Sequence, residues 1–194
     1  MRKVLIDWLI DVHMKFKLLP ETLFIAVNLI DRYTEKTQIL RKDYQLLGVS
    51  CMMIAAKYEE IYPPQVGNFA YITDNAYDRD QILACERDVL TCLDFNLTFP
   101  TSLRFLERYA KLTKCNSRIF YLSRYFLELS LIEVYSNKWN PAKLATAALF
   151  VAYKIEKEHM PQGIPFLPAQ DNAMKEIVKS ICLLIPSAHE KRCF

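Results

Sequence analysis

Glycine is scarce in this sequence, with three residues among 194. A loop that cradles phosphate, of the G-x-G-x-x-G or Walker type, cannot be built from three scattered glycines. The three histidines are also scattered, and no paired Cys/His spacing typical of a zinc site accompanies them. No G-x-S-x-G nucleophile motif occurs either. We therefore expect neither a cofactor nor a metal, and no recognisable catalytic motif is present.

Long apolar runs are missing as well. No stretch reaches the length that spans a bilayer, and the first residues lack the charged, apolar and small-residue layout of a signal peptide. The net charge is +3 with no long basic run, so we expect neither a membrane nor nucleic acid as partner. The six cysteines include no C-x-x-C pair, and four of them lie in apolar helical patterns. This favours reduced thiols in an intracellular compartment.

What the sequence does contain is apolar residues at helical spacing. Predicted helices cover residues 1–16, 43–59 and 78–93, and another begins at Pro20, because proline is favoured in the first turn of a helix. The middle of helix 43–59 is apolar or small on every side, as expected for a central helix that is packed all round. Strand-type alternation is nowhere sustained. We therefore predict an all-α protein.

The helical pattern occurs twice. A shift of 97 residues places LLGVSCMMIAAKYEE (46–60) on KLATAALFVAYKIEK (143–157), and the same shift places Asp31 on Glu128. The string FNLTFPTS would link the two halves. We predict two tandem five-helix units, residues 1–97 and 98–194, although a chance match between two buried helices would give a similar alignment.

The first helix is apolar over an unusually wide arc. The apolar residues of MRKVLIDWLIDV cover roughly 240° of the helix at about 100° per residue, and Arg2 lies inside that arc. A surface helix needs only one apolar stripe. An exposed interaction surface, a dimer contact or a misassigned pattern would each account for the second apolar face.

Three charged residues lie where helical periodicity predicts core: Arg2, Asp31 and Glu86. A buried charge without a partner is costly, so each of them needs one. Arg2 and Asp31 have opposite signs and lie on successive helices, and we interpret them as an internal ion pair. Glu86 has no mate in its own helix, and Lys57 is the best candidate.

Lys57 and Glu86 allow two interpretations. A lysine at the C-terminus of a helix is favourable by its charge alone, and a misplaced helix boundary would turn Glu86 to solvent. Alternatively, both side chains line an apolar surface and hydrogen-bond the backbone of a partner. The residues alone leave this choice open.

Several strings resemble the cyclin box: MRKVLIDWLIDV, ETLFIAVNLIDRY, AAKYEEIYPPQVGNFAYITDNAY and ERDVLTCLDFNLTFPTSLRFLERY. HMKFKLLPET and KYEEIYPPQVGNF are most similar to mitotic, B-type cyclins, with A-type cyclins close behind. The motifs cover nearly all of residues 1–110 and match weakly thereafter. The resemblance implies two five-helix repeats, in agreement with the duplication. The helix that precedes the first box in the family is absent from residues 1–97.

The resemblance implies a regulatory subunit, not an enzyme, that acts at G2/M and mitosis in the nucleus and cytoplasm. Cyclins bind a cyclin-dependent Ser/Thr kinase and reposition its αC helix and activation segment, which completes the active site of the kinase. Lys57 and Glu86 match the charged pair that grips the kinase backbone. The implied kinase-binding residues are Ile54, Lys57, Tyr58, Glu59, Glu60, Glu86, Leu90, Phe95 and Leu97.

The resemblance also implies a hydrophobic docking groove that takes R-x-L peptides from substrates or inhibitors. Such a groove would explain the second apolar face of the first helix. Asp11 would receive the arginine of the peptide, and Tyr44 stands where leucine is usual in the family. Arg2 and Asp31 match an internal ion pair of the family. The implied groove residues are Met1, Val4, Leu5, Trp8, Asp11, Arg41, Tyr44, Gln45 and Ile72.

Two other classes of function fit these residues less well. A cyclin-fold general transcription factor that binds DNA and polymerase would show clustered Lys and Arg along one face, whereas here they are interspersed with 22 acidic residues. An all-α enzyme would need paired acids on facing helices, whereas Glu59 and Glu60 are adjacent and point to different faces. EKEHMPQGIPFLPAQD contains three prolines, and we expect an irregular loop without assigned function across 158–171.

Overall fold

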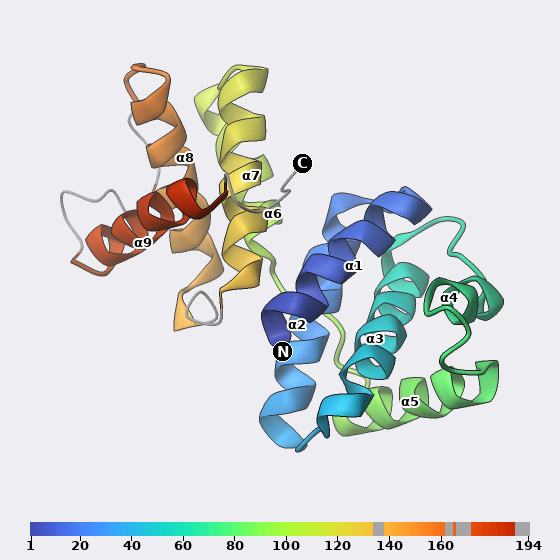
Figure 1. The fold of residues 1–194 in the computed structure, drawn as a ribbon. Coiled ribbons are helices and arrows are strands. Elements are labelled where there is room, and N and C mark those ends of the chain that lie inside the picture. Colours follow the sequence, from blue (N-terminus) through green and yellow to red (C-terminus); the bar gives the residue numbers. More distant parts are fainter. Residues whose placement is uncertain (134–137, 162–164, 166–171, 189–194) are drawn as a thin grey trace. The chain divides into compact units, whose positions relative to one another are not determined.

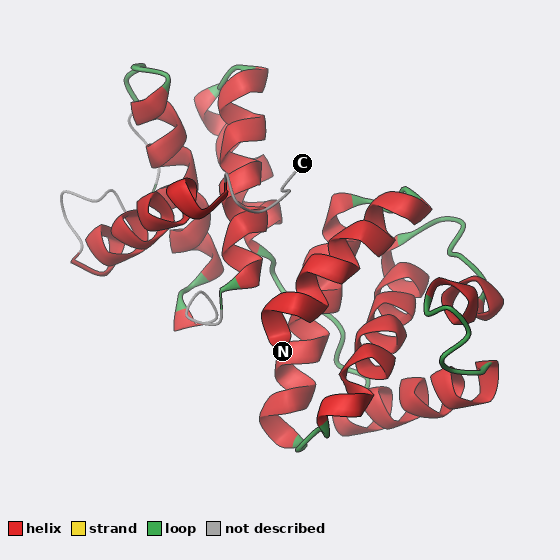
Figure 2. Cartoon of the chain, viewed as in Figure 1, coloured by secondary structure: helices red, strands yellow, loops and turns green. Residues whose placement is uncertain are grey.

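The computed structural model describes residues 1–133, 138–161, 165 and 172–188, with side chains up to residue 184. The chain divides into two compact units, Met1–Phe99 and Pro100–Phe194, and each is described by itself. The boundary predicted at 97/98 lies two residues from this division. In the described residues every regular element is a helix (Figure 2), which confirms the all-α prediction.

The first unit is built around α3, on which the other four α-helices pack (Figure 1). Every residue of α3 from Leu47 to Ala56 is buried, as its apolar sequence predicted. The elements of this unit are α1 (Arg2–Phe16), α2 (Pro20–Lys36), the 3-10 helix η1 (Arg41–Asp43), α3 (Tyr44–Glu59), α4 (Val66–Ile72) and α5 (Arg79–Cys92).

Local sequence signals set the ends of these helices. Pro20 occupies the first turn of α2, where its missing N–H costs no hydrogen bond. Asp78 begins α5 with a capping box, in which its carboxylate accepts from the Gln81 N–H at 2.8 Å and the Gln81 side chain accepts from the Asp78 N–H at 2.9 Å. Gly48 lets α1 approach α3 closely, because a Cβ at this position would lie 2.6 Å from a methyl carbon of Leu5.

The second unit has the same plan, with α8 at its centre. α6, α7 and α9 all pack against α8, whose sequence is rich in alanine and buried over most of its length. The described helices are α6 (Ser102–Thr113), α7 (Ser117–Ile132), α8 (Pro141–Ile155) and α9 (Asn172–Ala188).

The positions of these helices confirm the internal duplication. α7 begins 97 residues after α2, and α8 begins 97 residues after α3, which is the shift that aligned the two halves of the sequence. The counterpart of α4 would fall at about residues 163–169. The prediction of a fifth helix for the second unit therefore falls outside the described residues, as does most of the loop predicted at 158–171.

Candidate functional site

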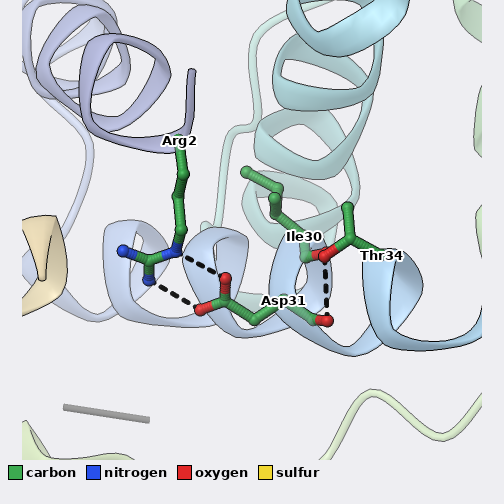
Figure 3. Close-up of polar contacts among 4 residues, drawn as sticks. All are labelled: Arg2, Ile30, Asp31 and Thr34. Atoms are coloured by element: carbon green, nitrogen blue, oxygen red, sulfur yellow. Dashed lines mark hydrogen bonds and ion pairs between the residues drawn. The ribbon is translucent and has the colours of Figure 1, made fainter. Parts of the chain in front are cut away.

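Arg2 and Asp31 form the predicted ion pair between α1 and α2 (Figure 3). Nε of Arg2 donates to Oδ1 of Asp31 at 2.7 Å, and a second guanidinium nitrogen donates to Oδ2 at 2.8 Å. The two side chains are 14% and 18% exposed. A two-pronged bond of this kind fixes orientation as well as distance, so it holds the start of α1 in place against α2.

Lys57 and Glu86 form the second predicted contact. Nζ of Lys57, near the end of α3, donates to both carboxylate oxygens of Glu86 on α5, at 2.7 and 2.8 Å. Glu86 is buried within α5, which rules out the misplaced helix boundary. The side chain of Lys57 is 47% exposed, against 11% for Glu86. An ammonium group has three N–H donors, and these two bonds use two of them, so Lys57 can also donate outward.

The aromatic and aliphatic side chains expected at this surface are exposed to different degrees. Tyr58 is 48% exposed and Phe95 is 69% exposed, and Leu90 and Leu97 are half-buried. Ile54 differs from the expectation: it is 2% exposed and belongs to the packed centre of α3. Its side chain is therefore buried within the first unit.

Two further exposed side chains, which were not anticipated, follow the end of α3. Ile61 and Tyr62 are 85% and 91% exposed. They lie between the end of α3 and the Pro63–Pro64 pair, where the chain cannot continue as helix. That signal was present in the sequence, because apolar residues just before two prolines have no helical face on which to bury.

The turn that carries Phe95 is held by α2. Asp94 and Phe95 both have left-handed backbone angles, with φ of 51° and 53°, an arrangement that is costly for residues other than glycine. Arg32 donates to the carbonyl of Asn96 at 2.8 Å, and Lys36 donates to the carbonyl of Cys92 at 3.2 Å. No sequence signal singled out these two cations, because hydrogen bonds between distant segments leave no local pattern.

Glu60 has an internal role in this unit. Its Oε1 accepts from the backbone N–H of Leu19 at 2.7 Å and from the hydroxyl of Thr22 at 2.5 Å. These bonds satisfy donors at the start of α2, where a helix leaves N–H groups without partners. Glu59 is half-buried next to it. Glu60 is therefore tied into the fold at the start of α2.

The predicted docking face of α1 is partly exposed. Val4 and Met1 are 70% and 53% exposed, Asp11 is exposed and Trp8 is half-buried. Leu5 differs from the prediction that it lines the groove, because it is 6% exposed and packs on α3 at Gly48. Leu5 therefore belongs to the core and not to the exposed floor of a groove.

The other expected groove residues belong to neighbouring elements of the same unit. Arg41 lies on η1 and is exposed, whereas Tyr44 and Gln45 at the start of α3 and Ile72 at the end of α4 are half-buried. η1 and α4 both contact α3, as α1 does. The residues expected to form the groove thus come from α3 and from three elements that contact it, namely α1, η1 and α4.

The part of the chain that the structure describes contains neither a cluster of metal-ligating residues nor a membrane-spanning helix. No group of three or more His, Cys, Asp or Glu residues could hold a metal ion there, and no described helix is both long and apolar enough to cross a bilayer. The five described cysteines are free thiols. Burial raises the pKa of Cys51 well above its ordinary value and also raises the pKa of Cys85.

Comparisons with known proteins match both units. The family model for the cyclin N-terminal domain matches residues 1–98, and the model for the cyclin C-terminal domain matches residues 100–193. A G2/mitotic-specific cyclin-B of Marthasterias glacialis is 39% identical over 191 residues, which are 97% of this chain and 49% of the relative. A G2/mitotic-specific cyclin-A of Hydra viridissima is 43% identical over 171 residues, which are 87% of this chain and 40% of the relative.

Solved structures show the same fold. A viral cyclin from herpesvirus saimiri has a TM-score of 0.83 at 18% identity, covering 96% of this chain and 85% of that one. A chain of the yeast RNA Pol II CTD kinase CTDK-1 complex has a TM-score of 0.76 at 13% identity, covering 93% of this chain and 63% of that one. The chain spans about half the length, or less, of the curated relatives described above. Two matched domains and close relatives place the chain in the cyclin family, whose members are non-catalytic regulatory subunits of kinases.

Proposed function

We propose that this chain binds and activates a cyclin-dependent Ser/Thr protein kinase through the surface around Lys57 and Glu86. The observation that carries the proposal is the pair itself, a nearly buried carboxylate bonded to a half-exposed ammonium group. Relatives named as cyclins, and a structural neighbour from a kinase complex, support the choice of partner.

The geometry fits the capture of a partner's backbone. Glu86 holds the Lys57 ammonium in place with two hydrogen bonds, so little side-chain entropy is lost when Lys57 donates to a carbonyl of the kinase. Phe95 and Tyr58, both exposed, would exclude water around that bond, and a hydrogen bond shielded from water is electrostatically stronger. Activation would follow from moving the kinase αC helix, whose glutamate must pair with the catalytic lysine.

We further propose that the exposed face of α1 docks R-x-L peptides of substrates or inhibitors. Val4 and Met1 offer apolar surface, and the exposed carboxylate of Asp11, on the same helix, would pair with the peptide arginine. The mitotic cyclins among the relatives support action at G2/M.

A kinase assay with the purified chain tests the main proposal. The chain is mixed with a mitotic cyclin-dependent kinase that is phosphorylated on its activation loop, and phosphorylation of an S/T-P-x-K peptide is measured. Strong stimulation is expected, and a binding assay on the same samples gives the dissociation constant. The absence of both binding and stimulation would refute the proposal, while binding without stimulation would restrict it to recruitment.

A further inference from the structure

The excess positive charge of this chain is concentrated in one short segment of the second unit. Five cations and one acid lie between residues 104 and 118, whereas the whole chain has a net charge of +3. The rest of the chain therefore has one more acidic than basic residue. Arg118, at the start of α7, is engaged with Glu156 at 3.0 Å, so the charge that is available to a partner lies mainly on α6.

α6 presents these cations on one face. Arg104, Arg108 and Lys111 are exposed and are spaced by four and three residues, which places them above one another on a helix. Leu106 and Tyr109 are buried and anchor the opposite side of the helix in the unit.

A hollow of about 390 Å³ lies along this basic face. Among the described residues its lining consists of three cations, one acid and one leucine, namely Arg104, Arg108, Lys111, Glu107 and Leu112. Arg104 contacts Glu107 at 3.3 Å. Within the described part of the chain neither Arg108 nor Lys111 forms an ion pair, and Leu112 is 62% exposed next to them.

We propose that this hollow is a docking site for an extended acidic segment of a partner protein. Arg104 and Lys111 are seven residues apart and so lie about 10 Å apart along the helix axis. That span is too long for a single phosphate group. Alternate side chains of an extended peptide face one way at intervals of about 6.6 Å, close to the rise of about 6 Å between Arg104 and Arg108. Acidic residues at alternate positions, followed by an apolar residue over Leu112, would fit the lining.

A nucleic acid fits the same hollow less well. Nucleic-acid binding draws on broad basic surfaces that neutralise many phosphates, whereas here three cations share the hollow with Glu107 and an exposed leucine. The carboxylate of Glu107 would repel a continuous phosphate backbone. A peptide whose acidic residues alternate with uncharged ones can place an uncharged residue opposite Glu107. The site lies on the second unit, so this proposal does not depend on kinase binding.

The test uses the whole chain and a fluorescent peptide in which glutamate alternates with serine and a leucine ends the sequence. Fluorescence anisotropy measures binding, and a matched peptide with glutamine for glutamate is the control. Saturable binding of the glutamate peptide is expected, and it should weaken between about 50 and 200 mM salt because the contacts are exposed. The glutamine peptide should bind at least about tenfold more weakly.

Variants assign the binding to α6. The double variant R108A/K111A should weaken binding of the glutamate peptide by about tenfold or more, and E107Q should strengthen it by about threefold, because a like charge is removed. The double variant K42A/K179A removes two exposed cations elsewhere and should bind as the unchanged chain does. Circular dichroism confirms that all variants fold.

Four results would overturn the proposal. The first two are that the glutamate peptide fails to bind at about 50 mM salt, and that the glutamine peptide binds as tightly as the glutamate peptide. The other two are that K42A/K179A weakens binding as much as R108A/K111A does, and that E107Q does not bind the glutamate peptide more tightly than the unchanged chain. A DNA oligonucleotide that binds more tightly than the peptide, and that depends on Arg108 and Lys111, would also overturn it in favour of a nucleic-acid surface.

Discussion

Glu86 keeps 11% of its side chain accessible, yet both of its carboxylate oxygens are bonded by a lysine that is 47% accessible. A carboxylate at this depth would be costly without a partner. The pair therefore satisfies two requirements at the scale of single residues. It compensates the charge inside the first unit, and it directs a positioned ammonium group toward the surface.

Replacing Glu86 by alanine should separate binding from folding. We expect E86A to weaken kinase binding by about tenfold to a hundredfold, since charge-assisted hydrogen bonds contribute about 1.5–3 kcal/mol. Lys57 is half-exposed and regains water in the variant, so we expect the free energy of unfolding to fall by about 1 kcal/mol or less. Isothermal titration with the kinase and thermal unfolding of the isolated chain measure the two effects.

Asp88 offers a matched control on the same helix. It is exposed on α5, so D88A removes one acidic side chain without touching the pair and should bind the kinase normally. Equal binding by E86A and the unchanged chain would contradict the role given to the pair.

Trp8 tests the docking face of α1. We expect W8A to leave phosphorylation of a short peptide unchanged and to reduce phosphorylation of proteins with an R-x-L motif by about thirtyfold or more, since an aromatic anchor of an interface commonly contributes about 2 kcal/mol or more. Trp8 is half-buried, so the more exposed Val4 provides a second variant, V4D, that should fold normally and show the same selective loss. Unfolding of W8A together with normal docking by V4D would assign Trp8 to the core and refute the groove.

At the scale of elements, α2 determines how the end of α5 is presented. Two consecutive residues in the left-handed region would be unfavourable on their own, and the bonds from Arg32 and Lys36 to backbone carbonyls stabilise the turn that contains them. A further bond joins the hydroxyl groups of Tyr58 and Thr98 at 3.1 Å. Phe95 is thus exposed on a turn that is fixed from two helices.

Loosening this turn should weaken kinase binding even though the residue that is changed, Arg32, is not among those expected to contact the kinase. We expect R32A to weaken binding by about threefold to tenfold, because Phe95 must then be ordered on binding, at a cost of about 1 kcal/mol. Helix content by circular dichroism should be unchanged, and K42A, which removes an exposed cation on η1, is the control. A full effect of R32A in a chain that already has F95A would show that Arg32 does not act through Phe95.

At the scale of the whole molecule, the two units share one helical arrangement but expose different residues. Lys57 corresponds to Lys154 under the shift of 97 residues, but Glu86 corresponds to Leu183, which is 68% exposed. Among the described residues, the Lys–Glu pair of the first unit therefore has no counterpart at the corresponding positions of the second. In the second unit Lys154 lies over the ring of Phe150, 5.5 Å from its centre. Both units bury their central helices, α3 and α8, whereas their exposed residues differ.

The buried thiol of Cys51 reports on the integrity of the first unit. Burial raises its pKa well above the ordinary value, so the native thiol stays protonated and unreactive at pH 8. We expect a thiol reagent to modify exposed Cys182 at once and to modify Cys51 only as urea unfolds the first unit. Mass spectrometry of the two cysteine-containing peptides measures both reactions.

The same burial makes the stability of the first unit depend on pH. In the unfolded chain the Cys51 thiol ionises once the pH exceeds its ordinary pKa of 9.0, while the native thiol is still protonated, so the free energy of unfolding should fall above that pH. Rapid modification of native Cys51 would contradict this burial.

The sequence alone predicted the all-α class, indicated the duplication and pointed to the partners of the two ion pairs, because each rests on a local or periodic signal. Apolar spacing defines a helix, and a charge such as Glu86 inside an apolar face demands a partner of opposite sign. Only the tertiary structure decided which apolar residues are exposed and which backbone groups are held from afar. Leu5 is buried because Gly48 lets α1 approach α3, and Arg32 reaches a carbonyl that lies 64 residues away in the chain. Such contacts depend on how helices meet, which periodicity within one helix does not encode.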